Sequence, residues 1–101
     1  MSKFVYSLYD AKTKSFGFFG LFGCREEARR ALAINLLKCP EVAPALYPAD
    51  FVLFGLGEFN TGSEANPLVP FDVIDNCGTA LQILSDYNPQ KNEVKVEGKN
   101  A

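Results

Sequence analysis

The sequence predicts an α+β fold, in which an antiparallel sheet of about four strands, in the order β-β-α-β-β, carries the main helix on one face. Three observations lead to this prediction: two hairpin-like aromatic segments near the N-terminus, a helical repeat after them, and two further β-rich segments. The chain has 101 residues, of which 48% are hydrophobic and 22% are charged. This length and composition predict one domain that buries a core of its own.

The first two strands are predicted to form a hairpin. Residues 3–9, KFVYSLY, place Phe4, Tyr6 and Leu8 on one side of the chain, with the period of two that is typical of a strand. A polar turn, DAKTK, leads to residues 15–22, SFGFFGLF, whose glycines mark bulges or places of close approach. The turn is short enough to join the two strands directly.

The clearest helix is predicted over residues 24–40, where apolar side chains recur at intervals of about three and four. Acidic residues in its first turn and Lys38 in its last suit the helix dipole, and Pro40 ends it. Residues 49–60 and 68–75 are rich in apolar and aromatic side chains and are predicted to be strands.

Residues 76–88 predict a short second helix, with a last strand as the alternative. We expect residues 1–88 to form the single α+β domain. Residues 89–101 are polar, and we expect them to form a flexible tail.

The residue types argue against an enzyme. Histidine is absent, so the commonest general base and the commonest transition-metal ligand are both missing. Three cysteines, Cys24, Cys39 and Cys77, form no C-x-x-C pair, and we expect buried, reduced thiols rather than a disulfide framework or a zinc site. We therefore expect no catalysis, no cofactor and no metal. Neither a membrane-spanning apolar run nor a signal peptide is recognisable, so we expect a cytoplasmic protein.

Charge is unevenly distributed, although the net charge is only −2. Residues 1–39 carry seven basic and three acidic side chains, a net of +4, whereas residues 40–101 carry three basic and nine acidic ones, a net of −6. The asymmetry is compatible with a basic face and equally with head-to-tail self-association. Because one helix covers only part of a four-stranded sheet, aromatic side chains on the other face would be exposed or covered by a second copy, and we expect a homodimer.

The run KSFGFF has the composition of strands that stack bases on aromatic rings and neutralise phosphates with nearby cations. It resembles the KGFGF run of cold-shock domains, although the helix that follows and the lack of tryptophan depart from that small barrel. The predicted nucleic-acid-binding side chains are aromatic and basic ones of the hairpin and basic ones of the first helix, namely Tyr6, Lys12, Lys14, Phe16, Phe18, Arg25, Arg29 and Arg30.

Alternatives remain open for these side chains. Tyr9 flanks the predicted stack as well as Tyr6 does. Aromatic rings of a small domain most often pack in the core, which would remove them from any ligand. The arginines would then form a solvated face, paired with Glu26 and Glu27.

Several segments, in order, resemble the small nonstructural proteins of gokushoviruses, which are single-stranded DNA phages of the Microviridae. They are FVYSLYDAKTKSF, EEARRAL, YPADFVLFGLGEFN and a TG turn, within residues 4–62. The resemblance implies a phage early protein of the host cytoplasm that is not part of the mature capsid and that binds DNA or steers replication toward single-strand synthesis and packaging. The glycine-rich FGFFGLFG departs from the proline-containing segment that is usual in that family.

Two functions are therefore predicted. The first is non-enzymatic binding of single-stranded DNA, by a dimer, during genome replication and packaging. The alternative is a protein-interaction module that regulates the phage replication initiator or the procapsid without touching DNA. An apolar patch on the sheet would be its hallmark, and neither function involves a membrane.

Overall fold

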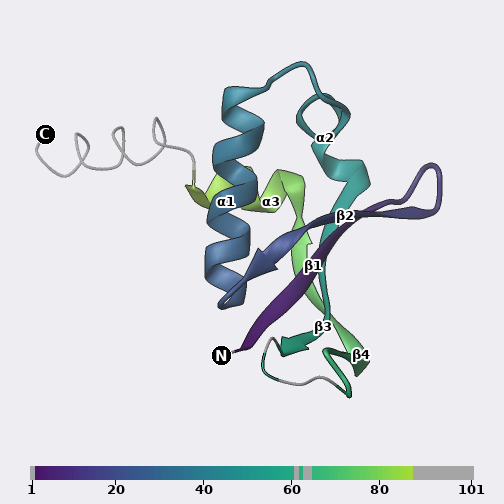
Figure 1. Ribbon diagram of the computed structural model, residues 1–101. Coiled ribbons are helices and arrows are strands. Elements are labelled where there is room, and N and C mark those ends of the chain that lie inside the picture. The colour runs from purple at the N-terminus through teal and green to yellow at the C-terminus, as the bar shows by residue number, and fades with distance from the viewer. Residues whose placement is uncertain (1, 61, 63–64, 88–101) are drawn as a thin grey trace, which may run out of the picture.

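The computed structural model describes residues 2–60, 62 and 65–87, which form an antiparallel sheet with helices on one side (Figure 1). The elements, in chain order, are β1 (Ser2–Asp10), β2 (Ser15–Phe22), α1 (Arg25–Lys38), α2 (Ala43–Leu46), the 3-10 turn η1 (Pro48–Asp50), β3 (Phe51–Asn60), β4 (Leu68–Thr79) and α3 (Ala80–Tyr87). The described strands lie in the order β2-β1-β3-β4, and every neighbouring pair is antiparallel. The predicted α+β class is confirmed.

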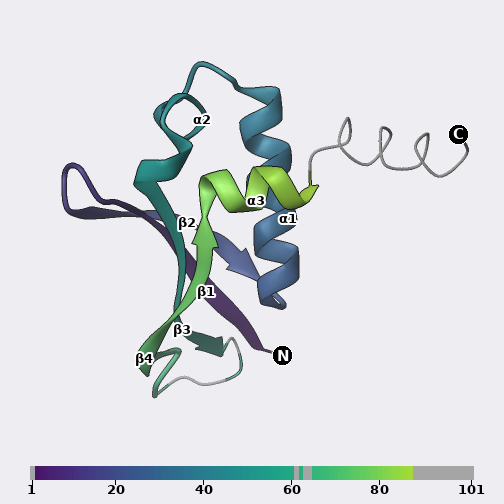
Figure 2. The same ribbon diagram turned by 180° about the vertical axis from the view of Figure 1, so that it is seen from behind.

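The core lies between the sheet and the two longer helices, α1 and α3, which pack against each other on the same side of the sheet (Figure 2). Tyr6 of β1 and Leu53 of β3 supply the sheet side of this core, and Leu32 of α1 and Ile83 of α3 supply the helix side. Each of these side chains is at most 4% exposed. Burying a large apolar side chain contributes about 1.5–3 kcal/mol, so this layer accounts for much of the stability of the fold.

The opposite face of the sheet is not covered by the described helices, and we call it the open face. It carries Ser7, Tyr9, Phe16, Phe18 and Phe54. The strand register places these side chains together, because Tyr9 is paired with Phe16, and Ser7 with both Phe18 and Phe54. Paired residues of neighbouring strands point to the same face of a sheet.

The pairing of β3 with β4 is interrupted. Gly55 faces Asp75 while Gly57 faces Pro70, so two steps along β3 correspond to five along β4, and the intervening residues of β4 leave the ladder. Gly57 sits where the strands approach closely, since a Cβ atom there would lie 2.6 Å from the carbonyl oxygen of Val69. Only glycine fits this crossing without a shift of the backbone.

Three local expectations differ from the structure. β4 continues to Thr79, beyond the predicted end at 75, because its last residues pair with β3. The last helix is present but begins only at Ala80. Cys24 and Cys39 are exposed rather than buried, because they flank the two ends of α1 outside the core, whereas Cys77 is buried as expected. The predicted tail, 89–101, lies outside the described residues.

Candidate nucleic-acid interface

Three aromatic rings pack together on the open face. The ring centroids of Tyr9 and Phe16 are 4.7 Å apart, those of Phe16 and Phe54 are 5.9 Å apart, and those of Tyr9 and Phe54 are 6.2 Å apart. Phe16 nevertheless stays 52% exposed, and Phe18, two residues further along β2, is 74% exposed. The register places Phe16 and Phe18 on the same face of β2. They present two rings to solvent above the half-buried Tyr9 and Phe54.

The two lysines of the hairpin lie on its tip, where Lys12 borders a pocket that Tyr47 and Phe51 also line. The tip is held by Asp10, whose carboxylate oxygen Oδ1 accepts from the backbone N–H of Lys12 at 2.9 Å and whose carbonyl accepts from the backbone N–H of Lys14 at 2.7 Å. Lys14 takes a left-handed conformation with a φ of 57°, which closes the turn. Asp is favoured at such positions because its side chain bonds the backbone a few residues on. The turn therefore presents Lys12 and Lys14, both exposed, within a few residues of Phe16.

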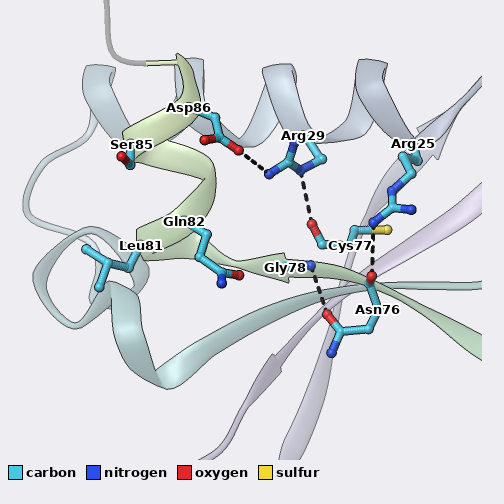
Figure 3. A pocket seen from close by; sticks show the side chains of 9 residues that line it. All are labelled: Arg25, Arg29, Asn76, Cys77, Gly78, Leu81, Gln82, Ser85 and Asp86. Carbon is cyan, nitrogen blue, oxygen red and sulfur yellow. Dashed lines mark hydrogen bonds and ion pairs between the residues drawn. The ribbon is translucent and has the colours of Figure 1, made fainter. Parts of the chain in front are cut away.

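Arg25 and Arg29 do not join this surface. They project from α1 into a groove between α1, β4 and α3, on the helix side of the sheet (Figure 3). Arg29 donates from Nε to the carbonyl of Cys77 at 3.0 Å, forms an ion pair with Asp86 at 2.7 Å, and lies 5.5 Å from the ring centroid of Tyr87. The guanidinium thus connects α1 with both β4 and α3.

Arg25 also connects α1 with β4, through weaker contacts. It donates to the carbonyl of Asn76 at 3.1 Å and lies 3.9 Å from the carboxylate of Asp75. The groove has a volume of about 720 Å³; Asp86 lines it and pairs with Arg29, and Asp75, which lies outside the lining, is 3.9 Å from Arg25. Because each guanidinium already has a carboxylate beside it, this groove is poorly suited to capture a phosphate.

Tyr6 is the clearest correction to the predicted site. It is 4% exposed and points under the helices, with its ring 5.9 Å from that of Phe22. Burial, with a smaller effect of the neighbouring Cys77, raises the pKa of Tyr6 to about 12. Tyr6 therefore has no access to a base. Tyr9, the alternative that the sequence offered, lies on the open face beside Phe16.

The acidic residues at the start of α1 have partners other than Arg25 and Arg29. Glu27 accepts from the backbone N–H of Gly23 at 3.1 Å, and Glu26 accepts from the hydroxyl of Tyr87. The expectation that these arginines pair with Glu26 and Glu27 is therefore wrong. Arg30 is exposed on α1, and the part of the chain that the structure describes gives it no ion pair.

Phe54 is the aromatic residue that sequence reasoning missed. Its signal was present in the alternation of residues 51–54, which places Phe54 on the face opposite Leu53. What the sequence did not contain was the register that pairs Phe54 with Ser7 and so brings its ring beside Phe16. Within a strand the alternation separates two faces, but only the neighbouring strands decide which side chains meet.

Neither a metal site nor a membrane-spanning helix is present in the part of the chain that the structure describes. No group of three or more His, Cys, Asp or Glu side chains is arranged to hold a metal ion among them. None of the helices that the structure describes is both long and apolar enough to cross a bilayer.

Comparison with known proteins gives one match. A family model described as Phage ORF5 protein matches residues 3–75, a stretch that runs from β1 into β4 and contains both the open face and α1. Comparison with curated proteins and with solved structures gives no match.

Proposed function

Because the chain belongs to the Phage ORF5 protein family, we propose that it is a small, non-enzymatic phage protein that binds single-stranded DNA through the open face. The observation that carries the proposal is the exposure of Phe16 and Phe18 on the face of the sheet opposite the helices, with the exposed Lys12 and Lys14 on the adjoining hairpin tip. The proposal is further supported by the resemblance of its sequence motifs, in their order, to those of gokushovirus proteins, because a single-stranded phage genome is a ligand of the right chemistry during replication and packaging.

The geometry suits stacking of unpaired bases. Phe16 and Phe18 are two residues apart on one strand, so their Cα atoms lie about 6.6 Å apart, and each ring is available to one base. Tyr9 and Phe54 brace Phe16 from beneath. The bases of a duplex are already stacked on each other, so such a surface prefers a single strand.

The basic part of the interface is smaller than the sequence suggested. Lys12 and Lys14 lie exposed on the hairpin tip, whereas Arg25 and Arg29 are engaged in the groove on the helix side of the sheet. With the overall net charge at −2, few phosphates can be neutralised at once. We therefore propose binding that is driven by stacking, with a shallow dependence on salt.

Fluorescence anisotropy of a labelled oligothymidine, titrated with protein at two salt concentrations, tests this proposal. Phe18→Ala should weaken binding between about 5- and 150-fold, since stacking on one ring is worth about 1–3 kcal/mol per base. The double change of Lys12→Glu and Lys14→Glu should reduce the salt slope by about 1.4, because each phosphate contact on a single strand contributes about 0.7.

Leu81→Ala is the matched control, because Leu81 is also an exposed apolar residue, at 52%, but lies on α3 at the groove. It should bind like the wild type, and a duplex of the same length should bind more weakly than the single strand. Equal loss of affinity in Phe18→Ala and Leu81→Ala, or no binding by the wild-type protein, would rule the proposal out.

The same exposed rings support a second candidate function. An apolar surface rimmed by polar residues also suits a protein partner, and here the partner would be the phage replication initiator or the procapsid. This function predicts no anisotropy change with DNA. It predicts instead that Phe18→Ala abolishes co-purification with one of those phage proteins, so the two candidates separate in the same set of variants.

A further inference from the structure

β2 is an edge strand without most of the features that protect such strands. Natural edge strands carry charges, prolines or bulges that prevent pairing with another chain. β2, SFGFFGLF, has no charged residue and no proline, and its one irregularity lies opposite the step from Tyr6 to Ser7. Ser15–Phe18 therefore remains regular and exposed. The other edge, β4, is interrupted and contains Pro70.

Backbone groups of β2 point toward the free edge at Phe16 and Phe18. The carbonyl of Gly17 accepts from the side-chain hydroxyl of Ser7 at 2.9 Å, so this carbonyl faces β1. Successive residues of a strand turn their N–H and C=O groups to opposite sides. The groups of Phe16 and Phe18 consequently face away from β1, where a further strand would bind them. The close ring contact of Tyr9 with Phe16 agrees, because side chains are nearest at pairs that exchange no hydrogen bonds.

A second copy of β2 fits this edge in a symmetric, antiparallel register centred on Gly17. In that register Phe16 of each copy exchanges hydrogen bonds with Phe18 of the other, and the two Gly17 residues face each other. Antiparallel partners approach most closely at such a pair, and glycine brings no side chain to it. The aromatic rings then alternate across the junction on the open face, where cross-strand aromatic pairs contribute about 0.2–1 kcal/mol each.

The symmetry of the exposed edge favours a second copy over another partner strand. The regular segment Ser15–Phe18 ends at the turn formed by Lys14 and at the irregularity between Phe18 and Gly20. Within it, Phe16 and Phe18 flank Gly17 on either side, so the same residues meet from either copy and each pairing is made twice. Because β2 carries no charge, two copies meet there without repulsion between like charges.

From these observations we infer that the protein forms a homodimer through antiparallel pairing of β2 with β2 about Gly17, which joins two sheets into one with all helices on the same side. The inference concerns the protein without DNA and does not depend on the proposed function. In each copy the hairpin tip extends away from α1 and α3 (Figure 2), and the joined sheet keeps its open face on the side opposite the helices.

Sedimentation velocity of the full chain without DNA tests the dimer. The wild type should dimerise reversibly, and Gly17→Lys should raise the dissociation constant by up to about fivefold, because two like charges then face each other directly. Within one copy a side chain is tolerated here, since a Cβ atom on Gly17 would meet only the Leu8 carbonyl at 3.9 Å. Gly17→Thr is the matched control and should keep the dimer, because facing threonines pair favourably.

Disulfide trapping tests the register. In a background of Cys24→Ser and Cys39→Ser, Gly17→Cys should oxidise to a covalent dimer, because the facing Cα atoms are close enough for a disulfide. Asn35→Cys, on the exposed side of α1, should not. A wild-type chain that sediments as a monomer throughout, a dimer equally stable in Gly17→Lys, or no trapping at Gly17→Cys would overturn the inference. None of these results bears on affinity for DNA.

Discussion

Arg29 shows how a single side chain can look like a ligand-binding group and act as a structural one. Its guanidinium bonds a backbone carbonyl, a carboxylate and an aromatic ring, and the side chain is only 16% exposed. Phosphate binding would require these contacts to be given up. At the scale of the residue, the cations therefore have two different roles. Arg25 and Arg29 stabilise the fold, whereas Lys12 and Lys14 remain available to a ligand at the hairpin tip.

This division predicts different consequences for two neighbouring arginines. Arg29→Ala should lower the free energy of unfolding by about 1.5–3 kcal/mol, because a charged hydrogen-bond donor to Cys77 and Asp86 is lost. Arg30→Ala should change it by no more than about 0.5 kcal/mol, as is usual for an exposed side chain. Urea denaturation measures both.

The DNA affinity of folded Arg29→Ala should equal that of the wild type. A variant that keeps its stability but loses DNA binding would assign Arg29 to the interface instead.

Strand glycines act at the scale of the element, and they do not act alike. Gly57 permits the close crossing of β3 with β4, where a Cβ atom would meet the Val69 carbonyl at 2.6 Å and the Cα atom of Pro70 at 2.8 Å. Gly17 lies on an open edge with space around it. Glycine thus allows the close packing of β3 against β4 at position 57, and at position 17 it leaves the free edge of β2 open to another chain.

Alanine substitutions separate these two roles. Gly57→Ala should destabilise the protein by about 1–3 kcal/mol, the usual cost of overpacking, because the contacts that it would make are with backbone atoms. Gly17→Ala should be neutral or slightly stabilising, since alanine restricts the unfolded chain. Thermal unfolding measures both changes, and a similar loss in the two variants would contradict the role given to the crossing.

Elements were more predictable from the sequence than contacts were. Alternation near the N-terminus and the helical repeat that ends at Pro40 gave the strands and α1, because both periods follow from local geometry. The interruption of β4 was not visible, since it depends on which residue Gly57 faces. The partner of Arg29 could not be foreseen either, because Asp86 comes from an element 57 residues away in the chain.

At the scale of the whole molecule, the sheet separates the hairpin residues from the arginines of α1, which were predicted from the sequence to form one interface. The open face carries Phe16 and Phe18 and adjoins the hairpin tip with its two lysines, whereas the groove of Arg25 and Arg29 lies on the helix side. Of the basic residues in the first part of the chain, Arg25 and Arg29 therefore connect elements of the fold, whereas Lys12 and Lys14 stay exposed. A base stacked on the open face is therefore separated by the sheet from the arginines of the groove.

The most direct test of the account is therefore to map the binding surface by NMR, titrating oligothymidine into the isotope-labelled protein. We predict that the backbone amide and ring signals of residues 12–18 shift most, together with those of Tyr9 and Phe54, while the signals of Arg29 and Gln82 in the groove stay in place. Shifts confined to the groove, or no shifts at a DNA concentration well above that of the protein, would contradict the assignment of the open face as the nucleic-acid interface.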